Sequence, residues 1–504
     1  MTIPLAVEPS VKTPGVYITV NLLAGAANPG AAANRALIIA SKSSAGAIAP
    51  QTEVREVFGP DDVATSHGPG TPGHLAAKMF YKRHPRGKLD VVAPTVSAGS
   101  TATHTQTFTG SATENSTIRL TYHGRPIDVP WNSGEANTVF VTRAVASVNE
   151  QSDDLFVVAA DGGAGDLDIT AKAAGPWGND VLLGAVVITG GGGITISANP
   201  TALAGGTTEP SFATVLSLVA TRGYRRIIGC CSNADAASAS ATSNPGRIET
   251  HIDALETGNQ AKLQVGVVGA TGTLADAKAG AIAKNNEAYQ YVFGQTFQSL
   301  PCELAASEAG DALRFIGIRA NFNRIGNRHD GLYGPADPVG EKMTANEVEN
   351  LLENGVTPID IEPISGELFV VRPITTHSLS GITPDYRAFD LPDTDGMYTV
   401  AEDVRDALPQ EFKNSSITED LPAGTNRLPP GVVERKDVQA FVVSRLGFWV
   451  DSGVVDGNKL EASIEAEELI VEINASDPTQ VDIFLPLAII KPLAKMGVVA
   501  AKVA

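Results

Sequence analysis

The stretch that decides the fold begins with RIIGC at residues 226–230 and continues through LQVGVV at 263–268 to YQYVF at 289–293. Each of these short apolar runs is typical of a strand. Helical patterns separate them, one near residues 244–258 and one from about 274 to 285. At the start of the second, Thr273 and Asp276 have the spacing of a capping box. Strand, helix and strand in alternation predict a parallel sheet.

The same alternation occurs near the beginning of the chain. ALIIA at 36–40 is a continuous apolar run of the kind that a sheet buries on both faces, and LDVVAP at 89–94 follows a helical pattern near 72–83. Between about 96 and 205 this rhythm stops, and Thr, Ser and Gly become frequent. We therefore predict an α/β domain of residues 24–95 and 206–365, interrupted by a β-rich insertion of residues 96–205.

A last α+β domain, residues 366–495, is expected to open with LFVVRPI at 368–374 and to contain a helix near 395–412. Its closing helix, which starts near residue 434, has one apolar stripe that Gly453 ends. The stripe consists of Val438, Phe441, Val442, Leu446, Trp449 and Val450. ELIVEI at 468–473 and VDIFL at 481–485 then predict a hairpin. The expected fold class is α+β, with several domains.

Each end of the chain carries an apolar, strand-like segment outside these domains. GVYITV at 15–20 lies in an N-terminal extended arm, residues 1–23, and GVVAAKVA at 497–504 dominates a C-terminal arm, residues 496–504. An isolated strand cannot bury itself, and an unpaired edge invites association. Each segment should therefore pair with a sheet elsewhere. For the N-terminal strand, folding back on its own domain remains an alternative.

Composition excludes several classes of protein. In 504 residues, 43% are hydrophobic and 18% charged, which is ordinary for a globular protein, and the formal net charge of -19 opposes direct nucleic-acid binding. The N-terminus lacks the features of a secretion signal, and the longest late apolar run is too short to span a bilayer, so we expect no membrane insertion. Three cysteines, two of them adjacent at Cys230 and Cys231, suit a reducing compartment.

Motifs for catalysis and for cofactors are weak. The glycine loop at 266–272 follows a strand and precedes a helix, but it lacks both the dinucleotide and the P-loop spacing. No pair of histidines has the spacing of a metal site, and Asp451 and Asp456 are better explained as a helix end than as a calcium loop. His329 and Asp330, beside Arg324 and Arg328, could act as acid or base, although a polar interface loop is favoured. We expect no enzymatic activity, no cofactor and no metal.

Two basic clusters stand out against the acidic composition. The first lies at the end of the helix near 72–83 and in the turn after it, and the second marks the C-terminal tail. Either cluster could meet an acidic partner face or simply form a solvated rim. Their members are Lys78, Lys82, Arg83, Arg86 and Lys88, and Lys491, Lys495 and Lys502.

Three short motifs occur in a fixed order along the chain. They are PGVY at 14–17, RPITT at 372–376, and VDIFLP at 481–486 after the closing helix. With them, the chain resembles the tail sheath proteins of contractile-tailed bacteriophages, nearest the Mu-like branch. The likeness covers both ends and the last domain well, and the α/β domain in outline.

The resemblance implies a structural subunit of a virion, assembled in the host cytoplasm. Such subunits form homo-hexameric rings that stack as a helical sheath around a tail tube protein, with baseplate and tail terminator proteins at the ends. Contraction to a lower-energy lattice, with rigid domains moving on extended linkers, drives the tube through the host envelope for genome delivery. The insertion would face outward. Alternatives are another virion structural or adhesion protein, or an α/β nucleotide-binding enzyme.

The resemblance also implies that each arm adds a strand to the last domain of a neighbouring subunit, which is β-augmentation. The N-terminal strand would consist of Val16, Tyr17, Ile18, Thr19 and Val20. The C-terminal strand would consist of Val498, Val499, Ala500, Ala501, Lys502 and Val503. The acceptor sheet would be the hairpin, through Leu469, Ile470, Val471, Ile473, Val481, Ile483 and Leu485.

Overall fold

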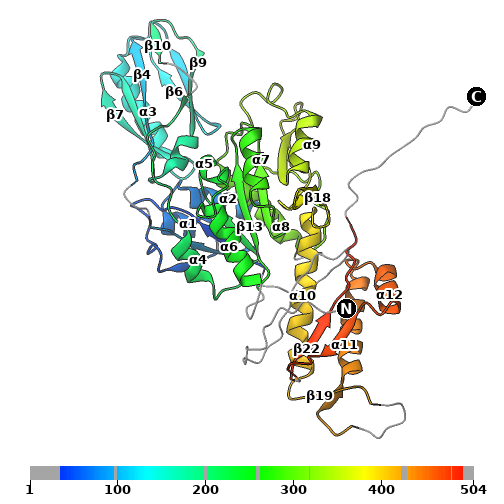
Figure 1. The fold of residues 1–504 in the computed structure, drawn as a ribbon. Coiled ribbons are helices and arrows are strands. Elements are labelled where there is room, and N and C mark those ends of the chain that lie inside the picture. Colours follow the sequence, from blue (N-terminus) through cyan, green and yellow to red (C-terminus); the bar gives the residue numbers. More distant parts are fainter. Residues whose placement is uncertain are drawn as a thin grey trace, which may run out of the picture.

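The fold is described by a computed structural model for residues 34–95, 99–197, 201–256, 262–316, 318–421, 428–477 and 479–491. The molecule is elongated, with a large sheet and its helices in the middle (Figure 1). The β-rich insertion lies at one end, and a C-terminal unit with a small hairpin lies at the other. The expected fold class, α+β with several units, is confirmed. No helix in these ranges is long and apolar enough to cross a membrane.

The central sheet has eight strands, and its interior neighbours are parallel, as the alternating pattern predicted. Only the edge strands β2 and β16 pair antiparallel with their neighbours. Every residue of β12 to β15 is buried, because helices cover both faces. In spatial order the strands are β16 (Leu368–Val370), β15 (Val356–Ile361), β14 (Tyr289–Phe293), β13 (Val265–Ala270), β12 (Arg226–Gly229), β1 (Arg35–Ile39), β3 (Lys88–Val92) and β2 (Val54–Val57).

Two glycines of β13 show how closely the helices pack on the two faces. A Cβ at Gly269 would lie 1.9 Å from the carbonyl oxygen of Pro301, at the start of α8. A Cβ at Gly266 would lie 2.8 Å from Ile248 on α6, which packs on the opposite face. The helices of this unit are α1 (Pro60–His67), α2 (Pro72–Arg83), α4 (Ala213–Val219), α5 (Asn233–Ala236), α6 (Asn244–Glu256), α7 (Leu274–Ile282), α8 (Pro301–Ile316) and α9 (Ala345–Glu353).

The insertion contains two four-stranded sheets, and all of their strands lie between residues 103 and 202. A helix that the sequence did not predict, α3 (Asn137–Glu150), contacts strands of both sheets and contributes Phe140, which stacks on Trp131 with ring centroids 4.4 Å apart. One sheet has β10 (Ile194–Ile196), β4 (Thr103–Gly110), β8 (Asp166–Ala171) and β7 (Val157–Gly163) in that order. The other has β11 (Thr201–Ala202), β9 (Leu182–Thr189), β5 (Ser116–Tyr122) and β6 (Arg125–Trp131).

The expected start of the last domain at residue 366 is wrong. Strand β16 belongs to the central sheet, because a turn at Gly366, with a φ of 72°, folds it back antiparallel to β15. The boundary falls instead within the long helix α10 (Leu391–Glu411). Tyr398 and Ala401 belong to the hydrophobic core that the central sheet shares with the insertion, whereas Val400 and Val404 belong to a second core.

The second core is built on the predicted closing helix, α11 (Arg435–Asp451), which is confirmed. Its stripe faces inward, and Gly453 follows the helix with a φ of 73°. Helix α12 (Gly457–Glu465) was not predicted, and Asp456 caps it by accepting from the backbone N–H of Lys459 at 3.3 Å, which confirms the interpretation of Asp456 as a helix end. The short strands are β17 (Leu379–Ser380), β18 (Thr383–Pro384), β19 (Ser416–Thr418), β20 (Val432–Glu434), β21 (Ile470–Ile473) and β22 (Val481–Phe484).

Candidate assembly site

The predicted hairpin is present, with β21 antiparallel to β22 and Val471 opposite Ile483. Leu469 directly precedes β21 and Leu485 directly follows β22, so the structure brings all the proposed acceptor residues together. The proposed donor strands, Val16–Val20 and Val498–Val503, lie outside the described residues. Pairing of the arms therefore stays a prediction.

The face of the hairpin that meets the second core is unevenly covered. Residues opposite each other in the ladder share a face, and on β21 the inward side chains Leu469 and Val471 are 4% and 1% exposed. On β22 the corresponding side chains of Val481, Ile483 and Leu485 pack against the same core but stay partly exposed. The core is thus incomplete beside β22, and another apolar strand there would complete it.

The backbone groups along β22 also indicate that a further strand can pair there. Asn474 N donates to Gln480 O at 2.9 Å, so the alternation of an antiparallel ladder turns the N–H and C=O groups of Val481 and Ile483 away from β21. Across the described ranges, no side chain or strand pairs with this outer edge of β22. The outer edge of β21 is different, because Arg435 Nη1 donates to Val471 O at 3.1 Å. Among the described residues, β22 is therefore the more open edge of the hairpin.

The chain that follows the hairpin is anchored in the C-terminal unit. Leu487, Ala488 and Ile489 are buried, and Asp456 N donates to Ala488 O at 2.9 Å. Lys491, from the second basic cluster, forms an ion pair with Asp393 at the start of α10. Burial raises the pKa of Asp393 to about 6, although Lys491 opposes the rise. The described part of the chain therefore ends in a segment that is packed against the C-terminal unit.

A buried ion pair and a partly buried one connect α10 to its two neighbouring units. On the side of the central sheet, Asp395 accepts two hydrogen bonds from Arg226, at 2.6 and 2.7 Å. On the side of the hairpin, Asp403 pairs with Arg445 and accepts from Trp449 Nε1 at 2.9 Å. Because α10 takes part in both hydrophobic cores as well, it holds the hairpin at a defined position relative to the central sheet.

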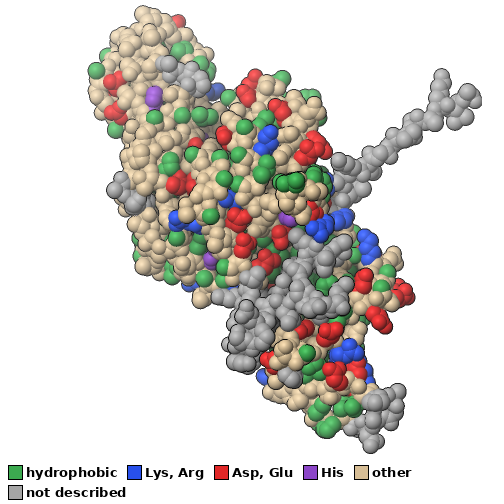
Figure 2. Space-filling model, in the orientation of Figure 1, with side chains coloured by type: hydrophobic (Ala, Val, Ile, Leu, Met, Phe, Trp, Pro, Cys, Tyr) green, Lys and Arg blue, Asp and Glu red, His purple; other side chains and the backbone are tan. Residues whose placement is uncertain are grey.

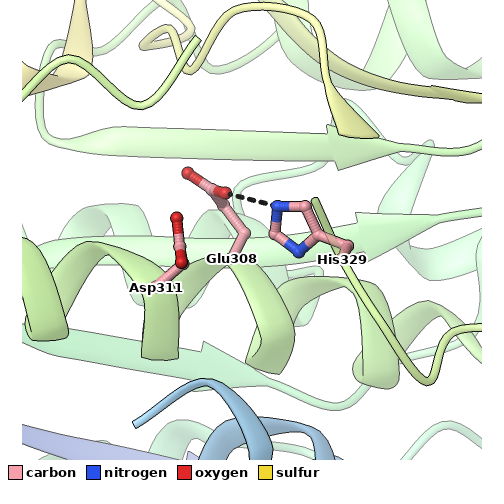
Figure 3. Close-up of side chains that lie close together, drawn as sticks. All are labelled: Glu308, Asp311 and His329. Carbon is pink, nitrogen blue, oxygen red and sulfur yellow. Dashed lines mark ion pairs between the residues drawn. The ribbon is translucent and has the colours of Figure 1, made fainter. Parts of the chain in front are cut away.

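His329 and Arg324, for which a polar interface loop was favoured, are instead buried in the core. His329 lies with Glu308 and Asp311, two residues of α8 (Figure 3), and all three are fully buried. The polar residues of α8 supply the partners that make this burial favourable. The other two members of the predicted cluster are separate, since Arg328 pairs with Glu367 at the surface and Asp330 is exposed.

The charges of this cluster are already balanced. Burial opposes ionisation of Glu308, but Arg324 and His329 outweigh it and lower the pKa of Glu308 to about 2. Asp311 accepts from Arg83 Nη2 at 2.9 Å. Two arginines thus neutralise two carboxylates, which leaves no excess negative charge to attract a metal ion.

Ser307 and His329 have the spacing of a nucleophile and its base, with Ser307 Oγ 2.8 Å from His329 Nδ1. Ser307, Glu308 and His329 are each 0% exposed, however, so a substrate cannot reach them in this conformation. The trio is best explained as part of a buried polar network, in which Ser307 hydrogen-bonds to His329 and His329 lies beside Glu308. The glycine loop at 266–272 also has a structural explanation. Gly266 and Gly269 leave room for the close approach of α6 and α8.

Opposite charges gather at different places on the surface. Figure 2 shows acidic side chains over α12, where Glu461 and Glu465 are exposed, as are Glu467 and Glu468 directly after the helix. In the first basic cluster, Lys78 pairs with Asp154 and Arg83 with Asp311. The exposed remainder of that cluster is Lys82, Arg86 and Lys88.

Arg435, Asp395 and the anchored segment 487–491 were not identified from the sequence as parts of this site. The pair Arg225-Arg226 in front of an apolar strand was a usable signal, because two adjacent arginines at a strand that becomes buried require acidic partners. The partner, Asp395, lies 169 residues away from Arg226. The contact between Arg435 and Val471 spans 36 residues and leaves no local pattern.

Three solved structures are similar to the chain over most of its length. The sheath tail protein of Desulfitobacterium hafniense is 14% identical, with 88% of this chain and 91% of that chain covered and a TM-score of 0.45. The sheath tail protein Lin1278 of Listeria innocua is 12% identical, with 86% of this chain and 87% of that chain covered and a TM-score of 0.45. A chain in the cryo-EM structure of the anti-feeding prophage baseplate is 12% identical, with 98% of this chain and 100% of that chain covered and a TM-score of 0.46. No protein-family model and no curated protein sequence matches the chain.

Proposed function

We propose that the chain is a structural subunit of a contractile tail sheath and that neighbouring copies are joined by strands added at the β22 edge. The observation that carries this proposal is the combination of an open backbone edge on β22 with the partly exposed apolar side chains Val481, Ile483 and Leu485 beneath it. Both features call for one more strand, which each terminal arm is suited to donate.

The energy of one such strand is modest. Each backbone hydrogen bond contributes about 0.5–1.5 kcal/mol net, and covering apolar surface adds about 25 cal/mol for each Å² removed from water. A single contact of this size is reversible at ordinary protein concentrations. In a closed lattice each subunit makes several contacts at once, and their combined affinity far exceeds that of one strand.

In the assembly that we propose, homo-hexameric rings stack helically around a tail tube, with baseplate and terminator proteins at the ends. The insertion lies at the far end of the molecule from the hairpin, so it faces outward when the hairpins build the inner lattice (Figure 1). Contraction rearranges the lattice while the strand pairings stay closed. Further contacts between copies join the exposed acids of α12 to the exposed bases Lys82, Arg86 and Lys88.

Negative-stain electron microscopy of the purified full-length chain tests the assembly directly. We expect hollow helical cylinders. Deleting residues 1–22 should leave monomers or disordered aggregate, and a circular dichroism spectrum close to that of the full chain should show that the units are still folded. A second deletion, of residues 496–504, tests the C-terminal arm in the same way.

Cylinders of normal appearance from the 1–22 deletion would rule out the donated N-terminal strand. Full-length protein that stays monomeric at high concentration would contradict the sheath function itself. A nucleotide that raises the melting temperature in a saturable way would instead favour the α/β enzyme.

A further inference from the structure

The insertion covers the place where α/β sheets usually bind ligands. Such ligands lie beyond the carboxyl ends of the strands, where the strand order reverses. In this sheet the order reverses at β1, which has β3 on one side and β12 on the other. The residues that follow β12, Ser232 and Asn233, contact the 3₁₀ helix η1 (Pro176–Asp180) of the insertion and the return segment, residues 203–211.

Two carboxyl groups make these contacts. Glu209, in the return segment, accepts from Ser232 Oγ at 2.9 Å and from Ser232 N at 3.3 Å. Asp180, at the end of η1, accepts from Asn233 N at 2.9 Å. Asp235 of α5 is a third acid beside them and accepts from Asn244 N at 3.2 Å. We call Asp180, Glu209 and Asp235 the carboxylate lock.

The lock lacks a countercharge for two of its members, since no cation within the described ranges pairs with Asp180 or Glu209. Burial raises the pKa of Glu209 to about 8, with a further contribution from Asp235 and Asp180, and burial raises that of Asp180 to about 6. The acids are partly exposed, whereas the Cys231 thiol beside them is buried. Arg247 on α6 and Lys284 after α7 favour ionisation of Asp235, whose pKa burial nevertheless raises.

A second attachment of the insertion has the opposite character. Arg125, at the start of β6, forms a buried ion pair with Glu303 of α8 at 2.8 Å, and its guanidinium lies 4.7 Å from the centre of the Tyr333 ring. Burial opposes ionisation of Glu303, but Arg125 outweighs it and holds the pKa below its usual value. This pair keeps its charges throughout the pH range in which Glu209 titrates.

We propose that ionisation of the carboxylate lock opens the contact that the insertion and the return segment make with Ser232 and Asn233, while the contact between Arg125 and Glu303 stays closed. The direction of the pH effect follows from the linkage between proton binding and the equilibrium between the closed and open states. A carboxyl group whose pKa is higher in the closed state binds its proton more tightly there. The closed state is therefore favoured at low pH and loses this advantage as the pH rises from about 4.5 to about 8.

Hydrogen–deuterium exchange of the full-length chain between about pH 5 and about pH 9 tests the lock. After correction for the intrinsic pH dependence of exchange, protection of residues 228–236 should fall by up to about tenfold per pH unit below about pH 8. Protection of residues 300–306, beside the Arg125–Glu303 pair, should not change. In the Glu209→Gln variant, which can still accept from Ser232, most of the pH dependence should disappear. The exposed Glu150→Gln should behave like the unchanged chain.

Identical pH profiles for the unchanged chain and Glu209→Gln would overturn the proposal, as would equal loosening at both attachments. If Glu209→Gln does not fold, Asp180→Asn takes its place and should shift the onset of opening. The regional comparison in the unchanged chain decides the question without any variant. None of these outcomes depends on assembly, so the lock and the proposed sheath function are tested separately.

Discussion

The hairpin of the C-terminal unit differs from the sheets of the insertion in its edge strands. The hairpin leaves the edge of β22 open among the described residues, whereas the edge strands of the insertion are short or contacted by side chains. In the insertion, β10 and β11 are only three and two residues long, and the longer edge strands are closed by side chains. Asn149 of α3 donates to Ala159 O at 2.8 Å and accepts from Ala159 N at 2.9 Å, which satisfies the outward backbone groups of Ala159 in the edge strand β7. These are recognised defences against edge-to-edge pairing.

Strand β6 is closed in a second way. Pro126 and Pro130 cannot donate a hydrogen bond, and Arg143 donates to the outward carbonyl of Pro130. Within the described residues, β22 of the hairpin has none of these devices, whereas on the outer edge of β21 Arg435 donates to the carbonyl of Val471. Among the described residues, edges are thus closed in the insertion and one is left open in the hairpin, which is the contrast that the proposed strand addition requires.

The largest effect is expected from closing the open edge. Ile483→Pro removes an outward N–H of β22 without removing a hydrogen bond of the hairpin itself, so the fold should persist while assembly is lost. Electron microscopy should show no cylinders. The matched control is Ile473→Pro, at the equivalent outward position of β21, which should still assemble. If the two variants assemble equally well, β22 is not the acceptor edge.

A second test removes the support that presents the hairpin. Asp395→Asn leaves Arg226, which is 0% exposed, without its countercharge. Breaking a buried pair of this kind costs about 3–5 kcal/mol, which chemical denaturation should reveal as an earlier unfolding transition. Asp406→Asn, an exposed position on the same helix, should change the unfolding free energy by less than about 0.5 kcal/mol. Equal stabilities of the two variants would show that the ion pair between Asp395 and Arg226 does not stabilise the position of α10.

A third test opens an edge that the molecule keeps closed. Asn149→Ala leaves the backbone groups of Ala159 unpaired, which should cost about 1–3 kcal/mol and create a new surface for strand pairing. Light scattering should detect slow self-association that survives deletion of residues 1–22. Glu150→Ala, the exposed neighbour on α3, should behave like the unchanged chain. Without new association in Asn149→Ala, the Asn149 contact is structural only.

The smallest effect concerns the acid side of the pH scale. Hydrogen bonds from Arg143 and Asn132 lower the pKa of Glu135 to about 2, and Arg143 in turn holds the carbonyl of Pro130. A lowered carboxyl pKa contributes stability above its usual value of about 4.5 that is lost as the pH falls toward 2. Hydrogen exchange in residues 125–131 should therefore rise over that range, and Glu135→Gln should show the higher rate already at neutral pH.

Much of the fold was predictable from local sequence patterns. The parallel strands around β12 were predicted because their apolar runs alternate with helical segments, and the closing helix because its apolar residues form one stripe. Helix α8 was missed for a physical reason. It is buried nearly all round, yet its sequence contains Glu303, Glu308 and Asp311, whose partners Arg125, Arg324 and Arg83 lie elsewhere in the chain.

The C-terminal boundary was misplaced for a related reason. The run LFVVRPI suggested a new domain, but its first strand pairs with β15 through the turn at Gly366. A strand pattern states that a segment is extended without stating which sheet receives it. Pro126 and Pro130, four residues apart in β6, were the one local sign of a protected edge.

From the sequence alone follow the alternation of strands and helices, the β-rich interruption, the closing helix and hairpin, and the resemblance to tail sheath proteins. These depend on periodicity and turn residues, which act between near neighbours. Which edge is open, which carboxyl groups are paired and where the units divide were decided only by the tertiary structure. The reason is that these features depend on contacts formed only on folding. Examples are the contacts that Asn149 and Arg435 make with backbone groups and the ion pair of Asp395, none of which has a local sequence pattern.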